Sequence, residues 1–191
     1  MGADARQHLA EVGHGLFLAN LAQSTGHVEE LAGDLDAAEA EYARSGADLE
    51  ALGESSYLST VAGLHARLLA RRGRTGQAEM ALEVARRHGS PDDVATQSLI
   101  LQTEGLLAAA AGEADRARAA IADAVRCGPR DEQPDAVGQA HLAAADVEQV
   151  LGSTSAEREH LTAAQVLFAA KGNLVEVRKV SRRLRDLTAN G

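Results

Sequence analysis

Apolar residues recur along the chain at spacings of three and four, which is the period of helices that bury one face. Glycines end one such segment and begin the next, so the pattern predicts a succession of helices. The expected helices cover residues 3–12, 14–32, 35–51, 56–72, 75–88, 91–111, 114–127, 134–151, 155–171 and 174–188. The sequence therefore predicts an all-α protein.

The expected helices repeat in pairs, and four glycines mark the repeat. Gly33, Gly73, Gly112 and Gly152 are 40, 39 and 40 residues apart. A glycine at such a place can adopt the left-handed conformation that closes a helix. Residues that can cap the next helix follow at Asp36, Thr75, Asp115 and Ser155. By the same reasoning, Ser90 is expected to cap the helix that begins with Pro91.

Residue size repeats in step with these glycines. Seven residues before each glycine the residue is small, and nine residues after it the residue is large. The small residues are Gly26, Ala66, Gly105 and Ala145, and the large ones are Tyr42, Leu82, Ile121 and Leu161. Small residues let the two helices of a pair approach closely, while the large residue fills the gap between neighbouring pairs.

Each repeat thus has a small residue and a turn glycine, followed by an alanine and a bulky residue on the second helix. This order resembles the tetratricopeptide repeat over almost the whole chain. The period departs from the usual ~34 residues. The Trp position of the consensus holds Ala22, Ala62, Leu101 and His141. The resemblance implies one domain over residues 1–191, an antiparallel helix-pair solenoid with a right-handed superhelix. Its four pairs are expected at residues 14–52, 55–89, 90–128 and 133–171.

The last expected helix, residues 174–188, has one apolar side and is predicted to cap the last pair. Its apolar residues are Leu174, Val177, Val180, Leu184 and Leu187, whereas Arg178, Arg182 and Arg185 lie elsewhere on the helix.

Tetratricopeptide arrays bind partners on the inner face, which the first helix of each pair lines. Transfer of those positions gives Asn20, Gln23, His27, Glu30, Thr60, Arg67, Arg71, Leu99, Gln102, Leu106, Gln139, Leu142, Asp146 and Gln149. An array that grips a C-terminal carboxylate needs Lys, Asn and Arg in set places, and only Asn20 and two arginines occur here. The apolar middle of this face suits an amphipathic helix of a partner. The alternative is that Leu99 and Leu106 simply pack inward.

Charge bears on the partner. With 28 acidic and 19 basic residues the net charge is −9, which argues against a nucleic-acid partner. Residues 1–60 hold 11 acids and 2 bases, so this region either steers a basic partner or is a solvated face. Cys127 is the only cysteine, which fits a reducing compartment, so we expect a cytoplasmic protein. No signal peptide or membrane-spanning run is recognisable, so no membrane partner is expected.

The stretch "LGESSYLSTVAGL", residues 52–64, contains the nearest approach to a nucleophile. Ser55 and Ser56 have no preceding strand to form a nucleophile elbow, so one of them is expected to cap a helix instead. "GRTG" at residues 73–76 lacks the Lys-Ser/Thr of a phosphate loop, and the seven histidines show no zinc-binding spacing. "DLDAAEAE" at residues 34–41 lacks the glycine of a calcium loop. We therefore expect no catalytic, cofactor-binding or metal-binding residues, and no enzyme.

The order and spacing of "LGESSYLST", "SPDDVATQ" and "AAKGN" give a more specific likeness over roughly residues 15–185. They resemble the C-terminal tetratricopeptide region of multidomain bacterial regulators, which carry a class III adenylate/guanylate cyclase domain and a P-loop ATPase module. The resemblance implies a non-catalytic sensor or scaffold arm of a signalling protein. A peptide, a linked cyclase or ATPase domain, or a second copy in a homodimer would dock on the inner face. The alternative is the small-molecule-sensing arm of a LuxR-type, ATP-dependent transcription regulator.

Overall fold

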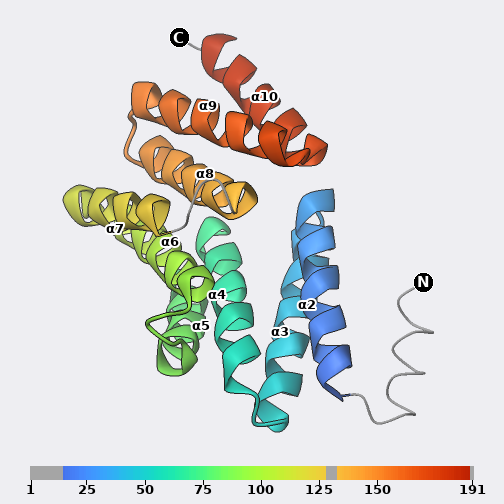
Figure 1. Ribbon diagram of the computed structural model, residues 1–191. Coiled ribbons are helices and arrows are strands. Elements are labelled where there is room, and N and C mark those ends of the chain that lie inside the picture. The colour runs from blue at the N-terminus through green and yellow to red at the C-terminus, as the bar shows by residue number, and fades with distance from the viewer. Residues whose placement is uncertain (1–14, 128–132, 190–191) are drawn as a thin grey trace.

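The computed structural model describes residues 15–127 and 133–189, and these residues are helical with no strand among them (Figure 1). The helices are α2 (Gly15–Ala32), α3 (Leu35–Ala51), α4 (Ser55–Arg71), α5 (Thr75–His88), α6 (Val94–Ala110), α7 (Ala114–Arg126), α8 (Pro134–Val150), α9 (Thr154–Lys171) and α10 (Leu174–Ala189). The predicted all-α fold is confirmed. The helix predicted at residues 3–12 lies outside the described residues.

Neighbouring helices pack as pairs, and the pairs stack in chain order. The pairs are α2 with α3, α4 with α5, α6 with α7 and α8 with α9, and α10 packs on α9. The first helices of successive pairs also touch, α4 with α6 and α6 with α8. Figure 1 shows the stack curving from α2 and α3 to α9 and α10. Its curvature brings α10 back to α2, where Lys179 Nζ donates to the Glu30 carbonyl at 3.2 Å.

Glycine is needed at the turns for its backbone conformation. The four repeat glycines have φ of 72° to 89°, as predicted, and Gly53 and Gly172 share this left-handed conformation. A Cβ built on any of these six glycines would meet nothing within 4 Å. The turns therefore exclude other residues through the cost of positive φ and not through lack of space.

The predicted alternation of small and large residues fixes how closely each pair packs. A Cβ on Gly26 would lie 2.7 Å from Tyr42 Cε1, and one on Gly105 would lie 2.6 Å from Ile121 Cγ1. In the other two pairs, Ala66 packs in one core cluster with Leu82, and Ala145 packs in another with Leu161. The large residue thus covers the small position of its own pair, and Ile121 also joins a core cluster with residues of α8.

The predicted helix-capping residues are wrong by one or two positions. The N-caps that follow the four repeat glycines are Asp34, Arg74, Glu113 and Ser153. The reason is that the residue after each glycine donates its N–H back to the preceding helix, as Asp34 N does to Glu29 O at 3.0 Å. That residue then starts the next helix directly.

The start of α6 is also displaced from its predicted position. Asp93 caps the helix by accepting from Thr96 N at 3.1 Å, so α6 begins at Val94 and not at Pro91. Residues 90–92 form a turn, in which Asp93 N donates to Ser90 O at 3.1 Å.

Leu174, predicted on the apolar side of α10, is 61% exposed at the first turn.

Glu54, and neither predicted serine, caps α4. Its carboxylate Oε1 accepts from Ser56 N at 2.9 Å and from Tyr57 N at 3.4 Å. Both Ser55 and Ser56 are exposed.

We therefore expect Glu54→Ala to destabilise the fold by about 0.5–2 kcal/mol, the usual cost of losing a cap. Ser56→Ala, which removes an exposed hydroxyl, is expected to change stability by less than about 0.5 kcal/mol. Urea denaturation followed by circular dichroism measures both. Equal losses in the two variants would contradict the assignment of the cap to Glu54.

Candidate functional site

The inner face of the stack is hollowed into two cavities. The first, called here the apolar cavity, has a volume of about 520 Å³, and the second, the charged cavity, has a volume of about 550 Å³. The predicted inner-face residues that line the apolar cavity are Gln23, His27, Thr60, Arg67, Leu99, Gln102 and Gln139. Those that line the charged cavity are Glu30, Arg71, Leu106, Leu142, Asp146 and Gln149. Asn20 lines neither cavity.

The apolar cavity is built mainly by the first helices of all four pairs. Residues of α2, α4, α6 and α8 form its wall, together with Ala124 of α7, and most of the lining is hydrocarbon. Leu99 is only 7% exposed, so it packs inward and still reaches the wall. Because four successive pairs contribute, any change in how the pairs stack changes this cavity.

Two buried polar side chains of the apolar cavity have unsatisfied atoms. Gln102 is 2% exposed; its Nε2 donates to Ser98 Oγ at 3.0 Å, and its Oε1 has no hydrogen-bond partner in the structure. Arg67 is 4% exposed; its Nη2 lies 3.3 Å from both carboxylate oxygens of Glu30, and its Nε has no partner. Buried polar atoms are normally paired, so these two side chains are exceptions behind the wall of the cavity.

A line of ion pairs crosses the inner face from α2 to α9, and four of its members line the charged cavity. Its members, called here the ion-pair chain, are Glu30, Arg67, Arg71, Asp146, Arg183 and Glu157. Arg71 Nε lies 2.9 Å from Asp146 Oδ2, which joins α4 to α8. Arg183 pairs with Asp146 and, at 2.7 Å, with Glu157 Oε1, which joins α10 to α8 and α9. Three acids and three arginines balance in charge.

The protonation of Glu30 follows from this arrangement. Burial alone raises the pKa of Glu30, but Arg67, Arg71 and the hydroxyl of Tyr42 together hold it below its ordinary value. Tyr42 donates to Glu30 Oε2 at 3.1 Å, and burial and the Glu30 charge raise the pKa of its phenol. Glu30 is therefore an anion that binds α2 to α3 and α4 at neutral pH.

Sequence reasoning did not find Arg183, Lys179, Ser98 or Tyr42 as parts of this face. Arg183 and Lys179 lie on α10, outside the repeats from which the inner-face positions were transferred. One signal for Arg183 was available in the sequence. It follows Val180, an apolar residue of the same helix, by three residues, so the two side chains lie about one helical turn apart.

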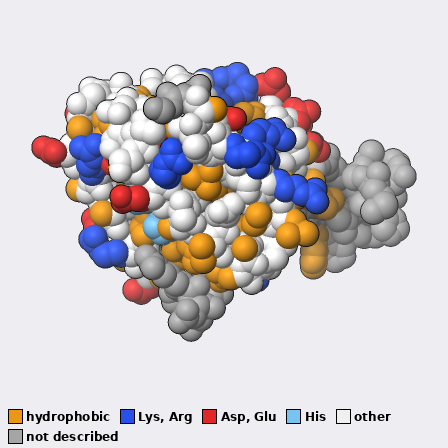
Figure 2. All heavy atoms as spheres, turned by 90° about the horizontal axis from the view of Figure 1, so that it is seen from above, with side chains coloured by type: hydrophobic (Ala, Val, Ile, Leu, Met, Phe, Trp, Pro, Cys, Tyr) orange, Lys and Arg blue, Asp and Glu red, His pale blue; other side chains and the backbone are white. Residues whose placement is uncertain are grey.

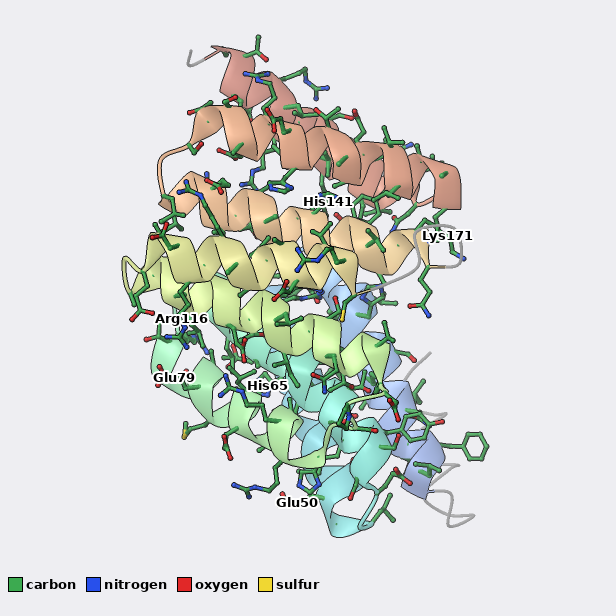
Figure 3. All side chains as sticks on the ribbon, turned by 60° about the vertical axis from the view of Figure 1, so that its left-hand side comes forward. Glu50, His65, Glu79, Arg116, His141 and Lys171 are labelled. Atoms are coloured by element: carbon green, nitrogen blue, oxygen red, sulfur yellow. The ribbon has the colours of Figure 1, made fainter. Side chains whose placement is uncertain are left out.

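A pair of histidines lies outside both cavities. His141 of α8 points toward α9 (Figure 3), and its Nδ1 lies 3.0 Å from Nδ1 of His160. Burial lowers the pKa of His160, and Glu148 and Glu159 oppose this shift. Two neutral rings that meet at this distance need one Nδ1 atom that donates and one that accepts.

Among the residues that the structure describes, no three His, Cys, Asp or Glu side chains are grouped so as to hold a metal ion. Within the same ranges, no helix combines the length and the apolar character that a membrane-spanning segment requires.

No protein-family model matches the chain, and no curated protein matches it significantly.

Proposed function

We propose that the chain is a non-catalytic regulatory domain that binds a ligand on the inner face of a helical-repeat stack. It acts as the sensor arm of a larger signalling protein of the cyclase and P-loop ATPase type that the sequence resembles. The observation that carries this proposal is the apolar cavity, whose wall is built by the first helices of all four pairs.

The ion pairs that cross the inner face favour a sensor of small molecules over a peptide-binding groove. The ion-pair chain crosses the inner face, and the contact of Lys179 with Glu30 ties α10 to α2. A helix of a partner, about 10 Å across with its side chains, needs an uninterrupted groove along this face. A small molecule needs only a cavity of a few hundred Å³.

Ligand binding gives the stack a means to signal. A ligand that contacts α2, α4, α6 and α8 together stabilises one curvature of the stack over others, because each pair contacts only its neighbours. The change then reaches whatever domain is attached to the ends of the stack.

A thermal-shift screen of small molecules against the intact chain, beside a cavity-filling variant, tests the proposal. Ala95 is exposed and lines the apolar cavity, so Ala95→Phe adds volume there without displacing packed atoms. Ala122→Phe, on an exposed alanine of α7 outside both cavities, is the matched control. We expect ligands that raise the Tm of the unmodified chain and of the control, and that fail to do so with Ala95→Phe. Ligands that act equally on all three would contradict the proposal.

A scaffold function is the second candidate, and the surface of α10 favours it. Arg178, Arg182 and Arg185 are exposed there. Figure 2, seen from the end where α10 lies, shows Lys and Arg side chains gathered over this face, with Asp and Glu mostly at its edges. This surface suits an acidic partner protein. Two findings would favour the scaffold: an upstream coding frame that encodes a cyclase or ATPase domain, and capture of that domain by the chain. The predicted homodimer stays a prediction.

A further inference from the structure

We propose that the apolar cavity binds an uncharged molecule made mostly of hydrocarbon. The inference rests on the proposed function and names the chemical class of its ligand. Three features of the cavity support it: the exposed apolar side chains in its lining, the volume that they surround, and the absence of an unpaired charge among the described lining residues.

Exposed hydrocarbon lines the cavity from three helices. Val28 of α2 is 59% exposed and Val94 of α6 is 38% exposed. Ala95 of α6 and Ala136 of α8 are exposed as well and line the same cavity. Single exposed apolar residues are common on protein surfaces, but these four lie around one hollow. A molecule in the cavity would contact them and remove part of their surface from water, which is favourable.

The apolar wall continues with side chains that are less exposed. Leu64 of α4 is half-buried, and Leu99 of α6 and Val137 of α8 are buried. All four first helices therefore contribute hydrocarbon to the wall. The volume of about 520 Å³ is within the range of small-molecule sites, which is about 300–1,000 Å³.

The wall offers a ligand no charge to pair with. Among the described lining residues, Arg67 is the one Lys or Arg, and no Asp or Glu is present. Arg67 is 4% exposed, and its Nη2 lies 3.3 Å from both carboxylate oxygens of Glu30, so its charge is already paired. An anion or a cation that entered the cavity would lose water without gaining a partner of opposite charge, which is unfavourable.

Hydroxyl and amide side chains of the lining accommodate one small polar group on the ligand. Ser24 and Gln133 are exposed, and Gln23 and Gln139 are half-buried. Each of these side chains can donate or accept a hydrogen bond. A hydroxyl group at one end of a hydrocarbon chain therefore fits the cavity better than a charged group does.

Straight-chain alcohols and their charged analogues test both requirements. We expect isothermal titration calorimetry of the whole chain at pH 7.5 to show a Kd that falls about 4-fold for each CH2 added between 1-hexanol and 1-octanol, the usual worth of a buried CH2. Octanoate and octylammonium carry a similar tail with a negative or a positive charge. Each should bind at least ~10-fold more weakly than 1-octanol.

The two exposed valines allow variants that locate the binding. Val28→Thr and Val94→Thr keep the shape of the side chain and replace one methyl group by a hydroxyl group. The double variant should raise the Kd of 1-octanol at least ~4-fold, and Ala95→Phe should abolish binding. Val166→Thr, the same change on an exposed valine of α9 that does not line the apolar cavity, should leave the Kd unchanged. Circular dichroism checks that each variant is folded; the comparison of the alcohol with the two ions on the unmodified chain decides the matter by itself if a variant unfolds.

The outcomes distinguish the inference from the function on which it rests. A preference for the alcohol that the double valine variant weakens and Ala95→Phe abolishes supports both. Equal or tighter binding of either ion, abolished by Ala95→Phe, overturns the uncharged class and leaves a ligand-binding cavity. A Kd for 1-octanol that neither the chain length nor the valine variants change overturns the hydrocarbon class in the same way. Binding that Ala95→Phe does not affect, or no binding of any probe together with a negative screen, overturns both.

Discussion

Replacement of Glu30 by alanine is expected to destabilise the fold by about 3–5 kcal/mol, because it leaves the guanidinium of Arg67 buried without its anion. The side chain of Arg67 is 5% exposed and that of Glu30 is 11% exposed, so water cannot replace the lost partner fully. In this variant Arg71 also loses an ion-pair partner, and the hydroxyl of Tyr42 loses its acceptor. Urea denaturation at pH 7.5 measures the loss.

A second substitution separates the cost of an unpaired charge from the cost of a lost contact. In the double variant Glu30→Ala/Arg67→Met no charge is left unpaired at this place, so most of the stability should return. Glu50→Ala, on an exposed carboxylate of α3 (Figure 3), is the control and should change stability by less than about 0.5 kcal/mol. A double variant as unstable as Glu30→Ala would show that the charge of Arg67 is not the cause.

The pH dependence of this effect has a definite sign. The pKa of Glu30 is lower in the folded chain than its ordinary value, so the unfolded chain binds its proton more readily. The stability from Glu30 is therefore complete above the ordinary pKa of a glutamate and is lost as the pH falls through the lowered value. The difference in stability between the unmodified chain and Glu30→Gln should shrink as the pH falls below ~4. A difference that is constant between pH 7 and pH 3 would contradict the ion pair.

The helices and their pairing are predictable because the information for them is local. The spacing of the turn glycines predicts a residue with positive φ at the end of a helix. The small and large residues Gly26 with Tyr42, and Gly105 with Ile121, predict a close contact within one pair. The cap of α4 was missed for a local reason as well. Serine is a favoured capping residue, and the sequence pattern gave no sign that Glu54 would reach the same N–H groups.

The division of the inner face into two cavities is not predictable in this way. It depends on pairs such as Arg71 with Asp146 and Lys179 with Glu30, which are 75 and 149 residues apart. The curvature of the stack decides which helices meet across the inner face. Small rotations between successive pairs add up to this curvature. The repeat pattern predicts which residues face inward but carries no information on which of them meet.

Phe168→Ala is expected to cost about 3–5 kcal/mol and to loosen the C-terminal end of the stack before the rest. Phe168 of α9 is fully buried, and its ring covers Gly138 of α8, where a Cβ would lie 2.7 Å from Phe168 Cε1. The same core cluster holds Val180 of α10. Loss of the ring therefore leaves a cavity where α8, α9 and α10 meet.

Because stacked pairs contact only their neighbours, this loss should remain regional. We expect hydrogen exchange of Phe168→Ala to rise in α9 and α10, while α4 and α5 stay protected. The exposed Val166→Ala, two residues away on the same helix, is the control and should leave exchange unchanged. A uniform rise in exchange along the chain would contradict this expectation, because it would mean that the stack unfolds as one unit. The ion-pair chain and the contact of Lys179 with Glu30 would then couple the two ends of the stack more strongly than the contacts between neighbouring pairs do. A regional rise would show that the C-terminal end of the stack opens while its middle stays folded.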